Sequence, residues 1–353
     1  MRRAAAAPGK RATFIASRQT EVSADGSDTA AVEPARGSRP RPPVGRRVSG
    51  WMFAAVPTGR VAAFRTVVYL FVALDPLWFT PWVRSHAAIP GVFYQPLFVG
   101  RLLHLPTPTP LLVNSIFWAL IPLAVAAATG RAPRLLGWIV FALYFEWMII
   151  AMSYGKVDHD RFGLLVALAV LPTAGPARHG GTRMTERGGW ALRMTQVAVI
   201  ATYFLSSWAK LRFGGVGWLT SATLERALIR RGTPLTDLLT STRWPLLLAQ
   251  FGIVAFELSS PIVFFVGSRL RYWIVGYFYL FHLMVMLTIT ISFAPHQAAM
   301  TSFLPLEKVR PIVWTRRLLR RLSRTLHRMR TDQSPNDRRR PSASSPAVVD
   351  GRR

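Results

Sequence analysis

Long apolar segments fill the middle of this 353-residue chain, and they restrict its fold more than any other feature. A helix needs about 20 mostly apolar residues to cross the ~30 Å hydrocarbon layer of a bilayer. Seven segments meet or approach this length: residues 61–80, 111–129, 135–153, 161–175, 190–211, 245–267 and 272–295. The fourth is the shortest. The sequence therefore predicts an all-α, polytopic transmembrane bundle of about seven to eight spans.

Basic charge is concentrated at the two ends of the chain. Residues 1–60 hold eleven Lys and Arg against four acids, and residues 305–353 hold fourteen against four, within a net charge of +28. A nucleic-acid-binding protein would carry this charge more evenly, so no nucleic acid partner is expected. The pattern predicts four regions: a disordered basic tail (1–54), a transmembrane domain (55–310), a basic amphipathic surface helix (311–330) and a disordered basic tail (331–353).

Arginines in the short loops predict the orientation, because such loops stay on the cytoplasmic side. They follow the second, fourth and sixth spans: Arg131, Arg134, Arg178, Arg183, Arg187, Arg269 and Arg271. The amino-terminal tail falls on the same side, as expected for a plasma or inner membrane protein. Seven crossings would leave the basic carboxyl-terminal region outside. Either residues 296–306 form an eighth crossing or a re-entrant segment, or that region departs from the rule. Its helix at 311–330 is expected to bind anionic lipid headgroups.

Several ionisable side chains lie within the apolar segments, where charge is costly and usually faces the bundle interior or a cavity. They are Arg65, Asp75, Glu146, Glu257 and His282, with Lys210 at the end of the fifth span. These groups are either structural ion pairs and hydrogen bonds that hold helices in register, or parts of a functional site. The chain has no cysteine, which excludes disulfides and thiolate metal ligands.

The fifth span carries a polar stripe. Gln196, Tyr203 and Lys210 are separated by seven residues each and share one helix face, which Ser206 and Ser207 complete. A lysine at the end of a span can simply extend its amine to the membrane surface. A helix needed only for anchoring would not carry such a stripe, so the pattern favours a site residue.

The loop at residues 154–162 contains Asp158, His159 and Asp160 in succession. Adjacent residues point in different directions and no second histidine motif supports them, so no metal site is predicted. Two interpretations remain: His159 transfers protons, or the loop is simply exposed to solvent. The predicted orientation places this loop, Lys210 and Asp75 together in the outer half of the bundle, above Glu257 and His282.

These residues fall into an ordered series of motifs. They are V-D-H-D at 157–160, R-x-x-Q at 193–196, Y-x6-K at 203–210, Trp218, E-L-S-x-P-x-x-F-F at 257–265, Y-F-x-x-F-H at 277–282 and I-S-F-A-P at 291–295. Over residues 55–310 their order and spacing resemble the HTTM (horizontally transferred transmembrane) domain proteins and the membrane core of vitamin K-dependent gamma-carboxylase. The large carboxyl-terminal region of the carboxylase has no counterpart, so a protein substrate is not expected.

The resemblance implies that Lys210 is the catalytic base for a reduced quinone such as vitamin K hydroquinone, with His159 as a second catalytic residue. A low-dielectric site would lower the pKa of such a lysine. The same resemblance, with the polar stripe, predicts these substrate-binding residues: Tyr203, Gln196, Asp158, Trp218, His282 and Glu257. The expected function is a quinol-dependent oxygenase or epoxidase that takes a lipophilic substrate from the bilayer. The alternative is a non-enzymatic transporter or partner subunit whose buried charges form ion pairs or a proton path.

Overall fold

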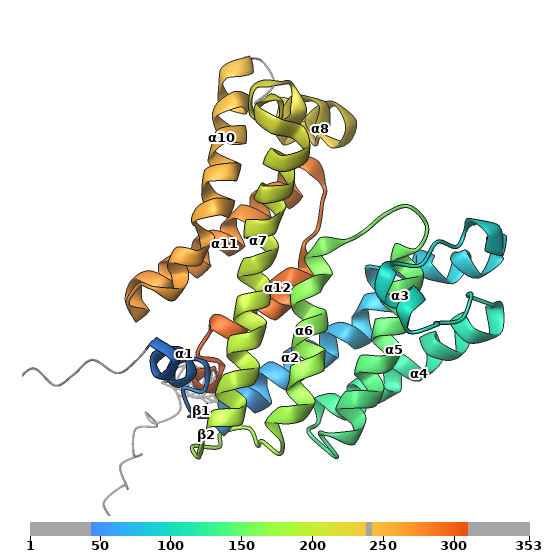
Figure 1. Cartoon of the computed structure of the whole chain (residues 1–353), viewed down its shortest axis with the longest axis vertical. Coiled ribbons are helices and arrows are strands. Elements are labelled where there is room, and N and C mark those ends of the chain that lie inside the picture. Colours follow the sequence, from blue (N-terminus) through green and yellow to red (C-terminus); the bar gives the residue numbers. More distant parts are fainter. Residues whose placement is uncertain (1–43, 238–241, 310–353) are drawn as a thin grey trace, which may run out of the picture. The chain divides into compact units, whose positions relative to one another are not determined.

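The computed structural model describes residues 44–237 and 242–309, which are mostly helical (Figure 1). The α-helices are α1 (Val44–Met52), α2 (Thr58–Trp78), α3 (Phe98–Leu102), α4 (Pro110–Ala128), α5 (Leu135–Met152), α6 (Phe162–Val170), α7 (Glu186–Thr220), α8 (Thr223–Arg231), α9 (Pro234–Asp237), α10 (Arg243–Ser259), α11 (Ser268–Ile289) and α12 (Ala294–Met300). Short 3₁₀ helices connect or extend them: η1 (Pro81–Ala88), η2 (Gly91–Phe93), η3 (His159–Arg161), η4 (Leu171–Ala174), η5 (Ser260–Phe264), η6 (Thr301–Phe303) and η7 (Leu306–Lys308). Two short strands, β1 (Val56–Pro57) and β2 (Met184–Thr185), pair antiparallel.

Five segments of the described chain are long and apolar enough to cross a bilayer: α2, α4, α5, α11 and the stretch Trp244–Phe264 of α10 and η5. They confirm the predicted all-α membrane bundle, while the count of seven to eight spans stays a prediction. The segment predicted at 161–175 contains α6, a helix of only nine residues that η4 extends. The span predicted at 190–211 lies within α7, which has 35 residues and carries the polar stripe.

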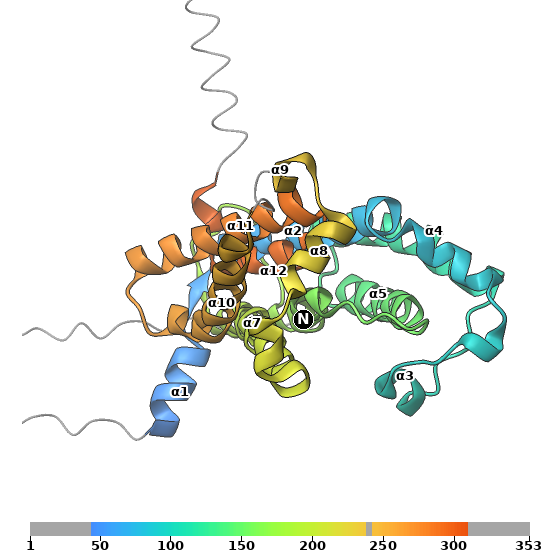
Figure 2. The ribbon, with the colours of Figure 1, turned by 90° about the horizontal axis from the view of Figure 1, so that it is seen from above.

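The helices pack pairwise around a continuous apolar core. α2 packs along α4, α4 along α5, and α6 along α7, while α10 lies beside α7 (Figure 2). The core includes the fully buried rings of Phe64, Tyr144 and Trp147. Because lipid is as apolar as these side chains, close packing and interhelical hydrogen bonds hold such a bundle together.

The loops that carry the predicted cytoplasmic arginines gather at one end of the bundle, the end at which α2 begins. We call it the basic end. The β1–β2 pair joins the residues before α2 to those before α7. Thr66 Oγ1 of α2 donates a hydrogen bond to the carbonyl of Ala128, the last residue of α4. Trp51 of α1 packs against Phe264 of η5. The opposite end, where α2 finishes and α7 carries Lys210, is called the site end.

After α11 the chain returns through the bundle to the basic end. α12 is largely buried and packs against α6 and α7. Gln196 Nε2 donates to the Ser302 carbonyl at 2.8 Å. Glu307 of η7 then accepts two hydrogen bonds from the Arg60 guanidinium, at 2.6 and 2.8 Å. Among the alternatives for residues 296–306, this geometry favours an additional passage, made of short helices and turns.

The predicted tail of residues 1–54 extends too far, because its last residues include α1. This helix is held by Trp51, whose ring meets Phe264 edge-on at 5.4 Å and lies 4.9 Å below the guanidinium of Arg193. The predictions for residues 1–43, for the surface helix at 311–330 and for the tail at 331–353 fall outside the described residues.

The return passage predicts which exposed positions share a side of the membrane. Since the chain has no cysteine, a single introduced cysteine reports its own location. Lys308, Thr182 and Ser85 are exposed. We expect Lys308→Cys and Thr182→Cys to react with a membrane-impermeant maleimide from one side of sealed vesicles, and Ser85→Cys from the other side. Labelling of Lys308→Cys and Ser85→Cys from the same side would contradict the return passage.

Candidate functional site

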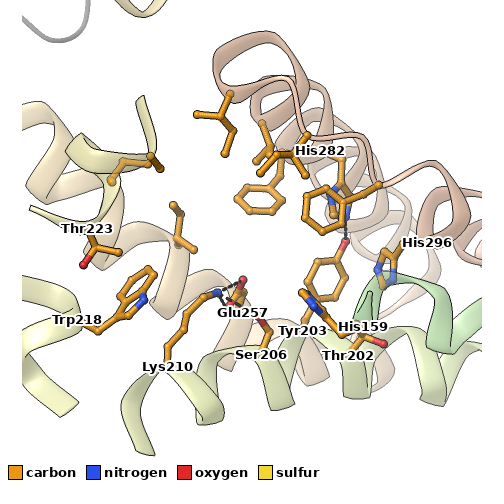
Figure 3. Close-up of a pocket in the computed structure, with 18 residues that line it drawn as sticks. His159, Thr202, Tyr203, Ser206, Lys210, Trp218, Thr223, Glu257, His282 and His296 are labelled. Atoms are coloured by element: carbon orange, nitrogen blue, oxygen red, sulfur yellow. Dashed lines mark hydrogen bonds and ion pairs between the residues drawn. The ribbon is translucent and has the colours of Figure 1, made fainter. Parts of the chain in front are cut away.

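A cavity of about 260 Å³ lies near the site end, between α7, α8, α10, α11 and α12 (Figure 3). We call it the head cavity. Its walls are mostly aliphatic and aromatic, and its polar groups come from separate helices. Six of the predicted site residues line it: His159, Tyr203, Lys210, Trp218, Glu257 and His282. All six belong to the motifs from which the sequence predicts a site.

One side of the head cavity is formed by an ion pair between α7 and α10. Lys210 Nζ lies 2.6 and 2.5 Å from the two carboxylate oxygens of Glu257 and 3.1 Å from Ser206 Oγ. Ser207 Oγ donates to Glu257 at 2.6 Å. Glu257 is buried, whereas the Lys210 side chain keeps 22% of its surface exposed. Lys210 therefore points into the bundle, and this orientation argues against a lysine that only reaches for the membrane surface.

The other side is formed by a hydrogen-bonded pair of rings. Tyr203 Oη lies 2.6 Å from Nε2 of His282 on α11, and both side chains are buried. The ring of His296 on α12 stands edge-on to Tyr203 at 4.7 Å. Neither nitrogen of His296, nor Nδ1 of His282, has a hydrogen-bond partner among the described residues. The cavity is therefore bordered by buried polar groups with unused hydrogen-bonding capacity.

His296 is enclosed in the bundle, with 1% of its surface exposed, and an unpaired charge on its ring would be costly there. A neutral imidazole offers one donor and one acceptor. Leaving a buried donor or acceptor unpaired costs about 1–3 kcal/mol. A ligand with hydroxyl or carbonyl groups would recover part of this cost.

His159 is brought to the head cavity by the residue two positions after it. Arg161 of η3 forms a salt bridge with Asp75 of α2, with Arg161 Nη1 2.7 Å from Asp75 Oδ1. Both side chains are almost completely buried. Tyr144 and Thr80 add hydrogen bonds to the same carboxylate, at 3.2 and 2.9 Å. This network fixes η3 against the bundle, so the exposed His159 ring lies at the cavity edge.

Trp218 reaches the cavity because α7 changes direction beyond Lys210. Gly215 has a φ of +58°, a left-handed conformation that glycine adopts without a steric penalty. Past this kink the indole of Trp218 lies 5.3 Å from Lys210 Nζ, within the range of a cation–π contact. The glycine-rich sequence after Lys210 thus positions an aromatic wall beside the ammonium group.

Gln196 and Asp158, two of the predicted substrate-binding residues, do not line the head cavity. Toward the basic end, Gln196 donates a hydrogen bond to the Ser302 carbonyl and accepts one from the Arg193 guanidinium. Fourteen residues separate it from Lys210, which is about 21 Å along a helix. Asp158 instead pairs with Lys156 at 2.8 Å. The two residues have structural contacts here.

The remaining ionisable groups in the apolar segments differ in their partners. Arg65 is buried and donates one hydrogen bond, to the Gly175 carbonyl. The carboxylate of Glu146 has no hydrogen-bond partner among the described residues. The ion-pair interpretation therefore describes Asp75 and Glu257, and it does not extend to Arg65 or Glu146.

Sequence reasoning missed Arg161 and His296. Asp75 lies deep in the first apolar segment, where its charge requires a cation, and Arg161 begins the fourth. That charge requirement is the sequence signal from which the pair could have been predicted. His296 gave no such signal. Within the described residues, no group of three or more His, Asp or Glu is close enough to hold a metal ion.

Comparison with known proteins gives partial matches. Over 120 residues the chain is 32% identical to a 4-hydroxybenzoate octaprenyltransferase of Xanthomonas euvesicatoria pv. vesicatoria (strain 85-10), covering 34% of this chain and 39% of that protein. A protein of the same name from Xanthomonas oryzae pv. oryzae (strain PXO99A) is 30% identical over 120 residues. The chain thus spans about two fifths of the length of these relatives. No family model and no solved structure matches it. With the apolar helices, these matches indicate a membrane-embedded protein.

The Lys210–Glu257 pair makes a prediction for stability. Glu257→Gln or Lys210→Met alone leaves one charge without its partner. We expect each to lower the free energy of unfolding by about 2 kcal/mol, less than for a fully enclosed pair because Lys210 is partly exposed. The double variant should recover most of this loss, as measured by thermal unfolding in detergent. Strictly additive losses would show that the two groups do not interact.

The Asp75–Arg161 bridge makes a second prediction, for the position of His159. Arg161→Met leaves an enclosed Asp75 carboxylate unpaired and should destabilise the protein by about 3–5 kcal/mol. Asp75→Asn combined with Arg161→Met should restore stability but release η3. Diethylpyrocarbonate labelling of His159, followed by mass spectrometry, should then be faster in the double variant than in the wild type. An unchanged labelling rate would show that the salt bridge does not hold His159 in place.

Proposed function

We propose that this protein is an intramembrane enzyme that binds a lipophilic quinol in the head cavity and activates it through the Lys210–Glu257 pair. The observation that carries the proposal is the pairing of polar groups across an apolar cavity. Lys210 and Glu257 lie on one side, and Tyr203 and His282 on the other (Figure 3). A flat ring with an oxygen at each end has the chemistry to meet both pairs.

The roles follow from the contacts. A quinol hydroxyl beside Lys210 loses its proton to the pair, because Glu257 can accept a proton from the ammonium as Lys210 takes one from the ligand. The ammonium that is re-formed stabilises the quinolate. The opposite ring oxygen accepts a hydrogen bond from Tyr203 or His282. His159, at the cavity edge, is proposed as the second proton-transfer group.

The quinolate then reacts with molecular oxygen, the co-reactant in this proposal. One oxygen atom enters the ring as an epoxide and the other leaves as water, which takes the two hydroxyl protons of the quinol. The quinol supplies all four electrons that reduce the oxygen molecule, two in its oxidation to the quinone and two in the epoxidation of the ring double bond. The resemblance to the HTTM domain proteins and the vitamin K-dependent gamma-carboxylase core supports this chemistry, since the motif residues Lys210, Tyr203, Glu257 and His282 border one cavity. The cofactor class proposed is a reduced quinone of the vitamin K hydroquinone type.

Prenyl transfer to a phenol is a second candidate, favoured by the partial matches to 4-hydroxybenzoate octaprenyltransferases. That activity also needs a cavity for an aromatic ring with a hydroxyl group. It differs from the first candidate in its second substrate, an activated prenyl donor in place of oxygen. The non-enzymatic alternative, a transporter or partner subunit, would use the same ion pairs without turning a substrate over.

The location proposed is the plasma or inner membrane, with the basic end facing the cytoplasm. The arginines that gather at this end support it, because cytoplasmic loops are enriched in basic residues. The proposed partners are the bilayer and its anionic headgroups.

The test is an incubation of the purified protein with a reduced naphthoquinone and oxygen, with epoxide detected by mass spectrometry. We expect product from the wild type and from the matched control Lys308→Ala, which changes a lysine of η7 outside the cavity. Lys210→Ala should reduce the rate at least 100-fold, because both the proton transfer and the stabilising charge are lost.

Two outcomes would contradict the oxygenase proposal. Equal epoxide from Lys210→Ala and the wild type would remove Lys210 from the mechanism. No epoxide from any protein, with prenylated 4-hydroxybenzoate formed from a polyprenyl diphosphate, would establish the second candidate instead. Failure of both reactions would favour the non-enzymatic alternative.

A further inference from the structure

A groove of about 650 Å³ lies between α10, η5 and α11, and it shares no lining residue with the head cavity. We call it the lateral groove. Small residues of α10 line one side of it: Gly252, Ala255 and Ser259. Two aromatic residues of α11, Trp273 and Tyr277, line the other. The lateral groove thus runs along two apolar helices toward the basic end, where α10 finishes and α11 begins.

The lateral groove is open on its outer side. Trp273 and Tyr277 keep 79% and 54% of their surface accessible, and Gly252 is exposed as well. A Cβ added to Gly252 would meet no neighbouring atom within 4 Å. Both α11 and the stretch Trp244–Phe264 are apolar enough to cross a bilayer. Exposed apolar side chains of such helices face lipid, so an acyl chain can enter the lateral groove from the side.

Unpaired basic charge lies at the end of the lateral groove. Arg269 comes four residues before Trp273 and therefore lies one turn away on the same face of α11. It is exposed and has no ion-pair or hydrogen-bond partner among the described residues. Arg271 donates to the carbonyls of Val263 and Val266, at 3.2 and 3.1 Å, and forms no ion pair within the described chain. Two cations thus border an apolar groove without an acid to balance them.

The depth of these residues matches that of a lipid headgroup. Trp273 lies near the start of α11, at the basic end of the bundle. Indole rings are enriched where the hydrocarbon layer meets the headgroups. The basic end is the one proposed to face the cytoplasm, and the cytoplasmic leaflet carries the anionic phospholipids.

Charge also argues against a second copy of the chain in the lateral groove. A two-fold symmetric dimer presents the same surface from both subunits, so the arginines of both copies would meet at one depth in the membrane. Glu257 is the only acid of α10, η5 and α11, and it is already paired with Lys210. The face therefore offers no acid to a second Arg269, and like charges would oppose the contact.

We propose that the lateral groove is a binding site for an anionic phospholipid, with the phosphate beside Arg269 and Arg271 and an acyl chain between α10 and α11. Trp273 lies between these two parts of the lipid. The inference gives the proposed anionic headgroups a defined site among the described residues. It rests on the proposed location in the membrane and is independent of any chemistry in the head cavity.

The experiment maps lipid contacts by photolabelling of the purified full chain in phosphatidylcholine nanodiscs. The probes are phosphatidylglycerol and phosphatidylcholine with the same diazirine-bearing acyl chain, and labelled peptides are quantified by mass spectrometry. Nanodiscs offer each probe in both leaflets, so the result does not depend on the orientation of the chain.

Each variant has a matched control. Arg269→Gln is compared with Arg187→Gln, which removes an exposed arginine of α7 at the same end. Gly252→Leu fills the lateral groove, and Gly276→Leu changes an exposed glycine of α11 that does not line it. A Cβ has open space at both glycines, and leucine favours a helix more than glycine does, so both variants should fold.

We expect the phosphatidylglycerol probe to label residues 252–260 and 273–278 at least about fivefold more than the phosphatidylcholine probe, the factor that one basic residue near anionic lipid supplies. Arg269→Gln should remove most of this preference, and Arg269→Lys, which keeps the charge, should retain it. Gly252→Leu should lower labelling by both probes, because its side chain takes the space of the acyl chain. Arg187→Gln and Gly276→Leu should change neither result.

The other outcomes overturn the proposal. Equal labelling by the two probes would mean that ordinary bilayer lipid fills the lateral groove. An equal loss of preference in Arg187→Gln would assign it to the general charge of the basic end, and unchanged labelling in Gly252→Leu would place the acyl chain elsewhere. Absence of labelling, with crosslinks between copies through α11, would make this face an interface between two chains. None of these results requires epoxide formation, so the proposed function and this inference fail separately.

Discussion

The salt bridge between Asp75 and Arg161 holds η3, and with it His159, against the bundle at the site end. An enclosed charge is tolerated in apolar surroundings only when it is paired and hydrogen-bonded. Tyr144 and Thr80 complete the carboxylate's hydrogen bonds, and Trp147 Nε1 donates to Thr80 at 3.0 Å. The bridge thereby ties η3 to α2 and α5, and the loop that bears His159 can adopt few other positions.

The same requirement explains the second pair and its chemical meaning. Glu257 is buried on α10 and needs a cation, which α7 supplies through Lys210. A lysine held in this way is not a free base. In the proposed mechanism, the pair accepts the proton as a unit, and Ser207 donates a hydrogen bond to its carboxylate. Structural pairing and a catalytic role are therefore compatible here, because the groups that hold α7 to α10 also border the head cavity.

Local pattern determined much of this structure in advance, and long-range packing determined the rest. Apolar length located α2, α4, α5 and α11, because a spanning helix satisfies its own backbone hydrogen bonds. The heptad spacing correctly placed Tyr203 and Lys210 on one face. The spacing alone does not show that Gln196 lies too far along the axis of α7 to line the same cavity. The role of His296 depends on α12 folding back against α7, a tertiary contact that no local pattern encodes.

We propose that the Lys210–Glu257 and Tyr203–His282 pairs bind the two oxygens of one quinone ring. Its most direct test is an experimental structure of the full chain with a quinone bound. We expect ring density in the head cavity, with one oxygen within hydrogen-bonding distance of Lys210 Nζ and the other near Tyr203 Oη or a ring nitrogen of His282. A quinone bound elsewhere, with the head cavity holding only solvent or lipid, would contradict it.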